Sequence, residues 1–233
     1  LGLEALLVLN DFGAIAWAAP ALGPDDCVHL HGRDDGPLQG PVTVMGPGTG
    51  LGVALLVGAD ARGWQVVETE GGHVTFAPIG EEEQVLSRWL TAQFGRASNE
   101  RVLCGNGLSH IDAVLREAAP GTPRPPLLLR EPTLRDPADI VSAALEGHDH
   151  VARRALARFC AVLGSVAGDA ALIHGARTVL IAGGSQSTTV PGTQGTQFEQ
   201  SVRGVEVSQI SQDAAPPRLE YDPGHPQANA QGY

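Results

Sequence analysis

The sequence PVTVMGPGTGLGVALLVG, from Pro41 to Gly58, decides how the rest of the chain is organised. Two apolar runs rich in β-branched residues, 42–45 and 52–57, are predicted to be strands on either side of a glycine turn. Glycine reaches backbone angles that a Cβ forbids, and successive N–H groups in a tight turn can bind an anion. The stretch therefore predicts a β-hairpin whose turn forms a nest for an anion.

Two other kinds of phosphate loop do not fit this stretch. A P-loop needs a Lys-Ser/Thr pair at the end of the glycine run, and none follows Gly52. A dinucleotide-binding loop must open a helix, whereas the residues from Leu51 onward read as a strand that ends in the next turn. Taken alone, a hairpin that binds no ligand is an equally good interpretation, since glycine turns are common between strands.

The composition is that of an acidic globular protein. The 233 residues are 42% hydrophobic and 4% aromatic, with a net charge of -11 and a pI near 5.0. This length allows one large or two small domains, and the negative charge argues against nucleic acid and membranes as partners. The three cysteines, at 27, 104 and 160, have neither disulfide nor zinc spacing. With no signal peptide and no clean membrane-spanning run, we expect a cytoplasmic protein.

Strand and helix patterns alternate along the remaining chain. A helix over 12–19 ends at Pro20, and 64–67 adds a third strand to the hairpin. Further helices are predicted from 81, over 108–119 after a break at 105–107, over 136–145 and over 151–175. The last is almost wholly apolar with many small residues, which indicates a buried helix packed on a sheet. With a buried strand at 178–181, the pattern predicts a mixed α/β fold.

Two polar motifs stand before and after the hairpin. Asn10-Asp11 lies where a short strand, 6–9, meets the first helix, a kind of junction that often binds ligands. Glu70 and His73 bracket two glycines, which let the backbone come close to a ligand. Taken alone, the second motif favours a turn with a solvated Glu and a hydrogen-bonded His. The histidine pairs at 29/31 and 148/150 lack a third ligand with convincing spacing, so we interpret them as surface and helix-cap residues.

The order of these motifs resembles that of one family. NDF, GPGTGLG, EGGH, NERVLCG and VLIAGG follow one another within residues 1–184, as in the bacterial glucokinase family. The resemblance implies an α/β fold of the actin-like ATPase (ribonuclease H-like) class, shared with hexokinases. It also implies phosphorylation of glucose to glucose 6-phosphate, with ATP and Mg²⁺ as cofactors, and a homodimer.

The resemblance assigns a role to each motif. The sugar-binding residues that it implies are Asn10, Asp11, Glu70, His73 and Glu100. Asp11 is the candidate general base that takes the proton from the attacking hydroxyl. The phosphate and ATP contacts that it implies are Gly48, Thr49, Gly50, Gly183 and Gly184. No residue of this chain is assigned to a metal.

Two departures from the family pattern set the expected domain organisation. The DxGGTN loop, which is the family's first phosphate loop, does not occur, and the sequence after Gly184 does not continue as the family does. We expect a remnant of a small domain at 1–21, a large domain at 22–184 and a disordered tail at 185–233, of foreign or frame-shifted origin. We also expect impaired turnover. The alternatives are a non-catalytic sugar-binding or regulatory protein and a non-functional fragment.

Overall fold

The computed structural model describes residues 10–23, 26–32, 38–117, 134–183 and 208–211. They form a six-stranded mixed sheet of order β1-β6-β5-β2-β3-β4. The strands are β1 (Val28–His31), β2 (Val42–Pro47), β3 (Leu51–Ala59), β4 (Gly63–Thr69), β5 (Thr178–Ile181) and β6 (Ser208–Ser211). The helices are α1 (Asp11–Ala18), α2 (Gly80–Phe94), α3 (Asn99–Val102), α4 (Gly105–Glu117), α5 (Pro137–Glu146) and α6 (His150–His174), with the 3-10 turns η1 (Ala19–Ala21) and η3 (Gly71–His73).

The hairpin predicted around the glycine turn is confirmed. β2 and β3 pair antiparallel, with Val44 opposite Ala54 and Gly46 opposite Gly52. β4 adds the predicted third antiparallel strand. β5 lies parallel to β2 on its other side, after a helical crossover of the kind that parallel strands require. The hairpin therefore occupies the middle of the sheet, and paired strands carry its turn.

Alternation of side chains along the strands divides the core into two clusters. One face of the sheet, with Met45 and Ile181, belongs to one core cluster with residues of α2, α4, α5 and α6. The opposite face, with Val44 and Leu180, packs against Ala16 of α1. Helices thus cover both faces of the sheet, which fits the predicted α/β class. The start of the chain, from α1 onward, packs directly on the sheet.

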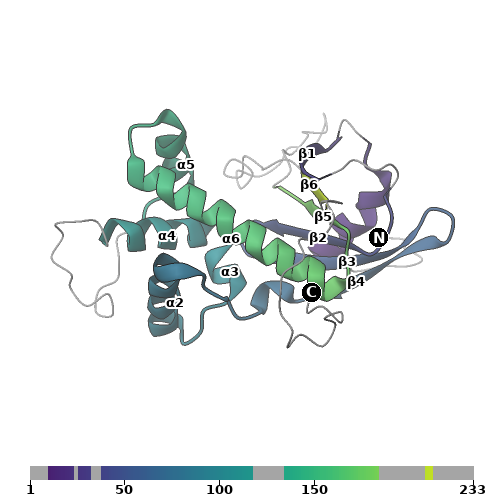
Figure 1. Cartoon of the computed structure of the whole chain (residues 1–233), viewed down its shortest axis with the longest axis horizontal. Coiled ribbons are helices and arrows are strands. Elements are labelled where there is room, and N and C mark those ends of the chain that lie inside the picture. Colours follow the sequence, from purple (N-terminus) through teal and green to yellow (C-terminus); the bar gives the residue numbers. More distant parts are fainter. Residues whose placement is uncertain (1–9, 24–25, 33–37, 118–133, 184–207, 212–233) are drawn as a thin grey trace, which may run out of the picture.

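Helix α6 is central to the fold, but it is only partly buried, whereas its sequence predicts a buried helix. Figure 1 shows it as a long helix that runs from α5 to the strands, with α2, α4 and α5 around its N-terminal half. Ala155 and Val162 are buried, whereas Leu172 and Ile173 are 76% and 77% exposed. The prediction was wrong because apolar composition does not say which side of a helix meets the core. By length and composition α6 could also cross a membrane, but its buried residues pack in the core of this domain.

Two further elements differ from the sequence prediction. Gly105 and Gly107 do not break a helix but lie in the first turn of α4. Ser208–Ser211, in the tail expected to be disordered, form β6 between β1 and β5. Strand pairing uses backbone groups, so a polar composition does not prevent it. The rest of the tail and the strand predicted at 6–9 lie outside the described residues.

A charged network ties α4 to the start of α6. Asp112, which is 1% exposed, accepts two hydrogen bonds from Arg116 at 2.8 and 2.9 Å. Arg116 and Arg135 both donate to Oδ2 of Asp149, at 2.5 and 2.9 Å. The other oxygen of Asp149 caps α6 by accepting amide N–H groups of its first turn. The metal-like sequence around Asp149 is therefore a helix cap, as predicted.

The network predicts an acid-sensitive contribution to stability. A hydrogen bond from the backbone amide of Ala152 holds the pKa of Asp149 well below its usual range, and the guanidinium groups of Arg116 and Arg135 add to this effect. At low pH the unfolded chain therefore binds a proton that the folded chain does not. The stabilisation is complete above about pH 4 and is lost as the pH falls further. Asp149→Asn, which keeps a good cap, should lower the unfolding free energy by about 1–3 kcal/mol at pH 7 and by much less at pH 2.

Urea denaturation of both proteins between pH 2 and pH 7 measures this difference. Asp139→Asn is the matched control, because Asp139 lies exposed in the first turn of α5. A stability difference for Asp149→Asn that did not change with pH would contradict the assignment.

Candidate functional site

Glu70, His73 and Glu100 form one cluster. Glu70 precedes η3 and His73 ends it, directly after β4, whereas Glu100 lies in α3. His73 Nε2 is 3.6 Å from Oε2 of Glu70, and its Nδ1 is 3.9 Å from Oε1 of Glu100. The three side chains are 81%, 59% and 33% exposed, in chain order. Two carboxylates and an imidazole thus converge at an open surface, which suits a ligand with several hydroxyl groups.

Backbone contacts hold α3 against the turn that carries His73. The hydroxyl of Ser98 caps α3 by accepting the N–H of Arg101 at 3.4 Å. The N–H of Asn99 donates to the carbonyl of Val74 at 2.9 Å. A helix of four residues is not stable alone. These contacts, made beside His73, therefore fix the place of Glu100.

Two buried side chains near α3, those of Cys104 and His110, are uncharged. Burial raises the pKa of Cys104 and lowers that of His110, so both are neutral at pH 7. Nδ1 of His110 is 3.3 Å from the carbonyl oxygen of Arg101. The Arg101 guanidinium lies 4.2 Å from the ring centre of Phe94, a cation–π contact.

The Glu100 carboxylate also reaches the glycine turn of the hairpin. The N–H of Leu51 donates to Oε2 of Glu100 at 3.1 Å. The N–H of Gly105, at the start of α4, donates to the carbonyl of Gly48 at 3.0 Å. Within the part of the chain that the structure describes, the amides of Thr49 and Gly50 donate to no protein acceptor. Open amides at a fixed turn can bind phosphate oxygens.

The hairpin glycines are needed for close approach and not for unusual backbone angles. None of the four glycines between positions 46 and 52 has a φ between +20° and +160°, so this part of the sequence prediction was wrong. A Cβ at Gly50 would lie 2.6 Å from Oε2 of Glu100. A Cβ at Gly52 would overlap the ring of Phe12. The turn lacks side chains where other parts of the site meet it.

Asn10 and Asp11 stand at the start of α1. Oδ1 of Asn10 caps the helix by accepting two amide N–H groups of its first turn, at 2.9 and 3.1 Å. Asp11 is exposed, and its Oδ1 accepts the N–H of Phe12 at 2.8 Å. The N–H of Asn10 donates to Oε1 of Glu68 in β4 at 3.3 Å. Because β4 continues into Glu70, this bond brings the start of α1 to the strand end that carries the cluster.

The Gly183-Gly184 pair was the last motif assigned from the sequence. Gly183 follows β5, and the N–H of the preceding Ala182 donates to the carbonyl of Met45 at 2.7 Å. The carbonyl of Ala182 also lies where a Cβ of Gly46 would be. Gly183 therefore lies beside the hairpin. Gly184 lies outside the described residues.

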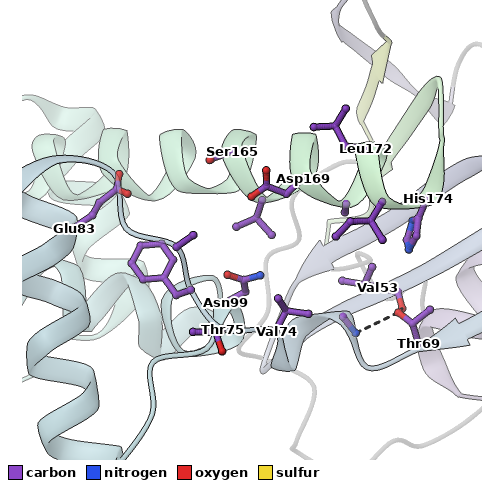
Figure 2. A pocket seen from close by; sticks show the side chains of 16 residues that line it. Val53, Thr69, Val74, Thr75, Glu83, Asn99, Ser165, Asp169, Leu172 and His174 are labelled. Carbon is purple, nitrogen blue, oxygen red and sulfur yellow. Dashed lines mark hydrogen bonds between the residues drawn. The ribbon is translucent and has the colours of Figure 1, made fainter. Parts of the chain in front are cut away.

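A separate cavity of about 440 Å³ lies between α6 and the segment after β4. Figure 2 shows Asp169 of α6 facing Asn99 across it, with Val74 beside Asn99. None of the sugar-binding residues implied by the sequence lines this cavity. The cavity is therefore not part of the cluster around His73.

Sequence reasoning missed Glu68 and Phe12, which join α1 to β4 and to the hairpin. Glu68 stands two residues before Glu70, and Phe12 sits between Asp11 and a glycine, but these signals are weak without the fold. Among the described residues, no group of three His, Cys, Asp or Glu side chains is arranged to hold a metal ion.

Comparisons with known proteins all point to one family. The model of the family described as Glucokinase matches residues 1–206. A glucokinase of Zymomonas mobilis is 42% identical over 186 residues, which is 79% of this chain and 54% of the relative. A glucokinase of Chromobacterium violaceum is 42% identical over 201 residues, 86% of this chain and 53% of the relative. The chain thus spans about half the length of these relatives.

Solved structures give the same fold. A glucokinase from an Antarctic psychrotroph matches with a TM-score of 0.59 and 33% identity, over 72% of this chain and 49% of that one. A glucokinase from Balamuthia mandrillaris in complex with glucose has a TM-score of 0.58 at 24% identity, over 73% and 48% of the two chains. The predicted fold class, α/β of the actin-like ATPase type, is confirmed.

The contact between Phe12 and the hairpin gives a test of how the site is assembled. Gly52→Ala should force the Phe12 ring and α1 away and lower the unfolding free energy by about 1–3 kcal/mol. Gly164→Ala is the control, since its Cβ would meet no atom within 4 Å. In that exposed helix position alanine should stabilise by about 0.5–1 kcal/mol. Urea denaturation gives both values, and similar effects at the two positions would rule out the close packing.

Proposed function

The chain belongs to the glucokinase family, and from this premise we propose that it carries the glucose-binding half of an ATP-dependent glucose kinase. The reaction transfers the γ-phosphoryl group of ATP to the 6-hydroxyl of glucose. Asn10, Asp11, Glu70, His73 and Glu100 bind the sugar in this proposal. The main support is the position of Glu100, whose two oxygens face the sugar cluster and the glycine turn respectively.

The chemistry of the cluster suits a sugar. Each sugar hydroxyl is both donor and acceptor, so a carboxylate that accepts and an imidazole that can donate satisfy neighbouring hydroxyls. Glu70 and Glu100 lie on the two sides of His73. Hydrogen bonds to charged groups contribute about 1.5–3 kcal/mol each, enough for selective binding by two or three contacts.

Asp11 is the proposed general base. It is exposed at the start of α1. A carboxylate that takes the hydroxyl proton as the phosphorus–oxygen bond forms raises the rate by about 10²–10⁴. Its other partner in the reaction, the γ-phosphate, would lie against the open amides of Thr49 and Gly50, with the adenosine part near Gly183 and Gly184.

Mg²⁺ is proposed to enter together with ATP. Mg²⁺ is usually held by substrate phosphates and one or two carboxylates, and not by a complete protein cage. In this proposal no residue of the chain is assigned as a Mg²⁺ ligand, and the phosphates of ATP carry the ion. When bound, the ion would neutralise charge that develops on the transferred phosphoryl group.

The remaining parts of the proposal concern organisation. We propose that residues 22–184 form the large domain and that residues 1–21 are the remnant of a smaller one, whose helix α1 packs on the sheet of the large domain. We further propose a cytoplasmic homodimer that acts on glucose and ATP without nucleic acid or membrane partners. The acidic net charge of -11 supports the last point.

A second candidate is a sugar-binding protein without turnover. It is favoured by one observation: Glu70, His73 and Glu100 lie close to one another, whereas Asp11 lies on α1, which the hydrogen bond from Asn10 to Glu68 joins to their strand. Calorimetric titration with glucose, together with ADP release from MgATP, separates the two. Binding with glucose-dependent ADP release supports the kinase, and binding alone supports the second candidate. An absence of glucose binding would overturn both.

Variants at two carboxylates should give different patterns. Glu100→Gln should weaken glucose binding about 10–100-fold, because it loses a charged acceptor. Asp11→Asn should lower kcat about 10²–10⁴-fold and change the glucose Kd by less than about threefold. Glu81→Gln, on the exposed first turn of α2, is the control for loss of one negative charge. Equal loss of affinity and turnover in Asp11→Asn would show that Asp11 is not the base.

A further inference from the structure

We propose that Glu68 is a positioning residue that fixes the Asn10-Asp11 turn relative to the sugar-binding residues. This inference rests on the proposed function. Its physical basis is the hydrogen bond from the Asn10 N–H to Oε1 of Glu68, which joins residues 58 positions apart.

The bond completes a capping box that α1 lacks. In a capping box, the N-cap side chain accepts the amide of the third helical residue, and a Glu at that third position accepts the N-cap amide. Here Asn10 is the N-cap and accepts the amide of Gly13 at 3.1 Å. Gly13, the third helical residue, has no side chain to return the bond. Glu68 supplies the missing carboxylate from β4.

Gly13 makes room for this arrangement. A Cβ at Gly13 would overlap Oε1 of Glu68 and lie 3.0 Å from its Cγ and Cδ. The Glu68 side chain therefore lies flat across the first turn of α1. Glycine is unfavourable inside a helix, and the passage of Glu68 accounts for it here.

This capping box is formed between two elements, α1 and β4, and not within one helix. A local box would fix only the helix, whereas the shared box fixes α1 to β4. Glu68 lies in β4, which ends at Thr69, one residue before Glu70. Phe12 fixes the same helix against Gly52 of the hairpin. The two contacts set both the position and the direction of Asp11.

Relocating the carboxylate separates positioning from helix capping. Glu68→Ala removes the bond and empties the space over Gly13, and Gly13→Glu in the same protein places a carboxylate at the local capping position. Glu68→Gln keeps an acceptor oxygen without the charge. The readouts are hydrogen exchange of the Asn10 amide without ligand and the calorimetric Kd for glucose, both on the full chain.

We expect Glu68→Ala to speed exchange of the Asn10 amide about tenfold and to raise the glucose Kd about three- to tenfold. Glu68→Gln should stay within about twofold of the wild type for Kd, since a neutral acceptor still orients the turn. In Glu68→Ala with Gly13→Glu, protection of the Asn10 amide should return while the Kd stays raised.

Two results would overturn the role of Glu68 and leave the proposed function unaffected. One is a glucose Kd unchanged in Glu68→Ala, and the other is a Kd restored by Gly13→Glu, which would show that Glu68 only caps the helix. A wild-type chain that binds no glucose would instead overturn the proposed function, and this role with it.

Discussion

One carboxylate, that of Glu100, is the constraint on which the site depends. Oε2 accepts the Leu51 amide beside the glycine turn at 3.1 Å, and Oε1 lies 3.9 Å from Nδ1 of His73. Neither partner is near Glu100 in sequence, so the contact exists only because α3 is held in place. The Ser98 cap and the bond from Asn99 to Val74 provide that support. A ligand that binds between His73 and Glu100 would therefore be coupled to the turn proposed to hold phosphate.

The second constraint is the close approach of α1 to the sheet. Glycines at the hairpin and in α1 remove side chains where Phe12 and Glu68 lie. The backbone angles of the hairpin glycines are ordinary, so their function here is to leave space. Because α1 packs closely on the sheet, the proposed base, Asp11, and the proposed phosphate turn are held by the same sheet. Phosphoryl transfer between two bound substrates requires such fixed positions.

Local patterns predicted much of this, and long-range contacts were not predictable. The two apolar runs on either side of the glycine turn were enough for the hairpin, and the order of the motifs was enough for the family. The burial of α6 could not be predicted, because an apolar helix with Leu172 and Ile173 gives no sign of which side meets the core. Glu68 was missed because its partner is 58 positions away, and only the packing of α1 on β4 brings them together.

The central claim is that glucose binding is linked to the glycine turn through Glu100. The most direct measurement is a glucose titration followed by NMR of the Leu51 amide and the His73 ring in the same sample. Both signals should shift with one common Kd. Glucose binding that shifted the His73 ring and left the Leu51 amide unchanged would contradict the claim.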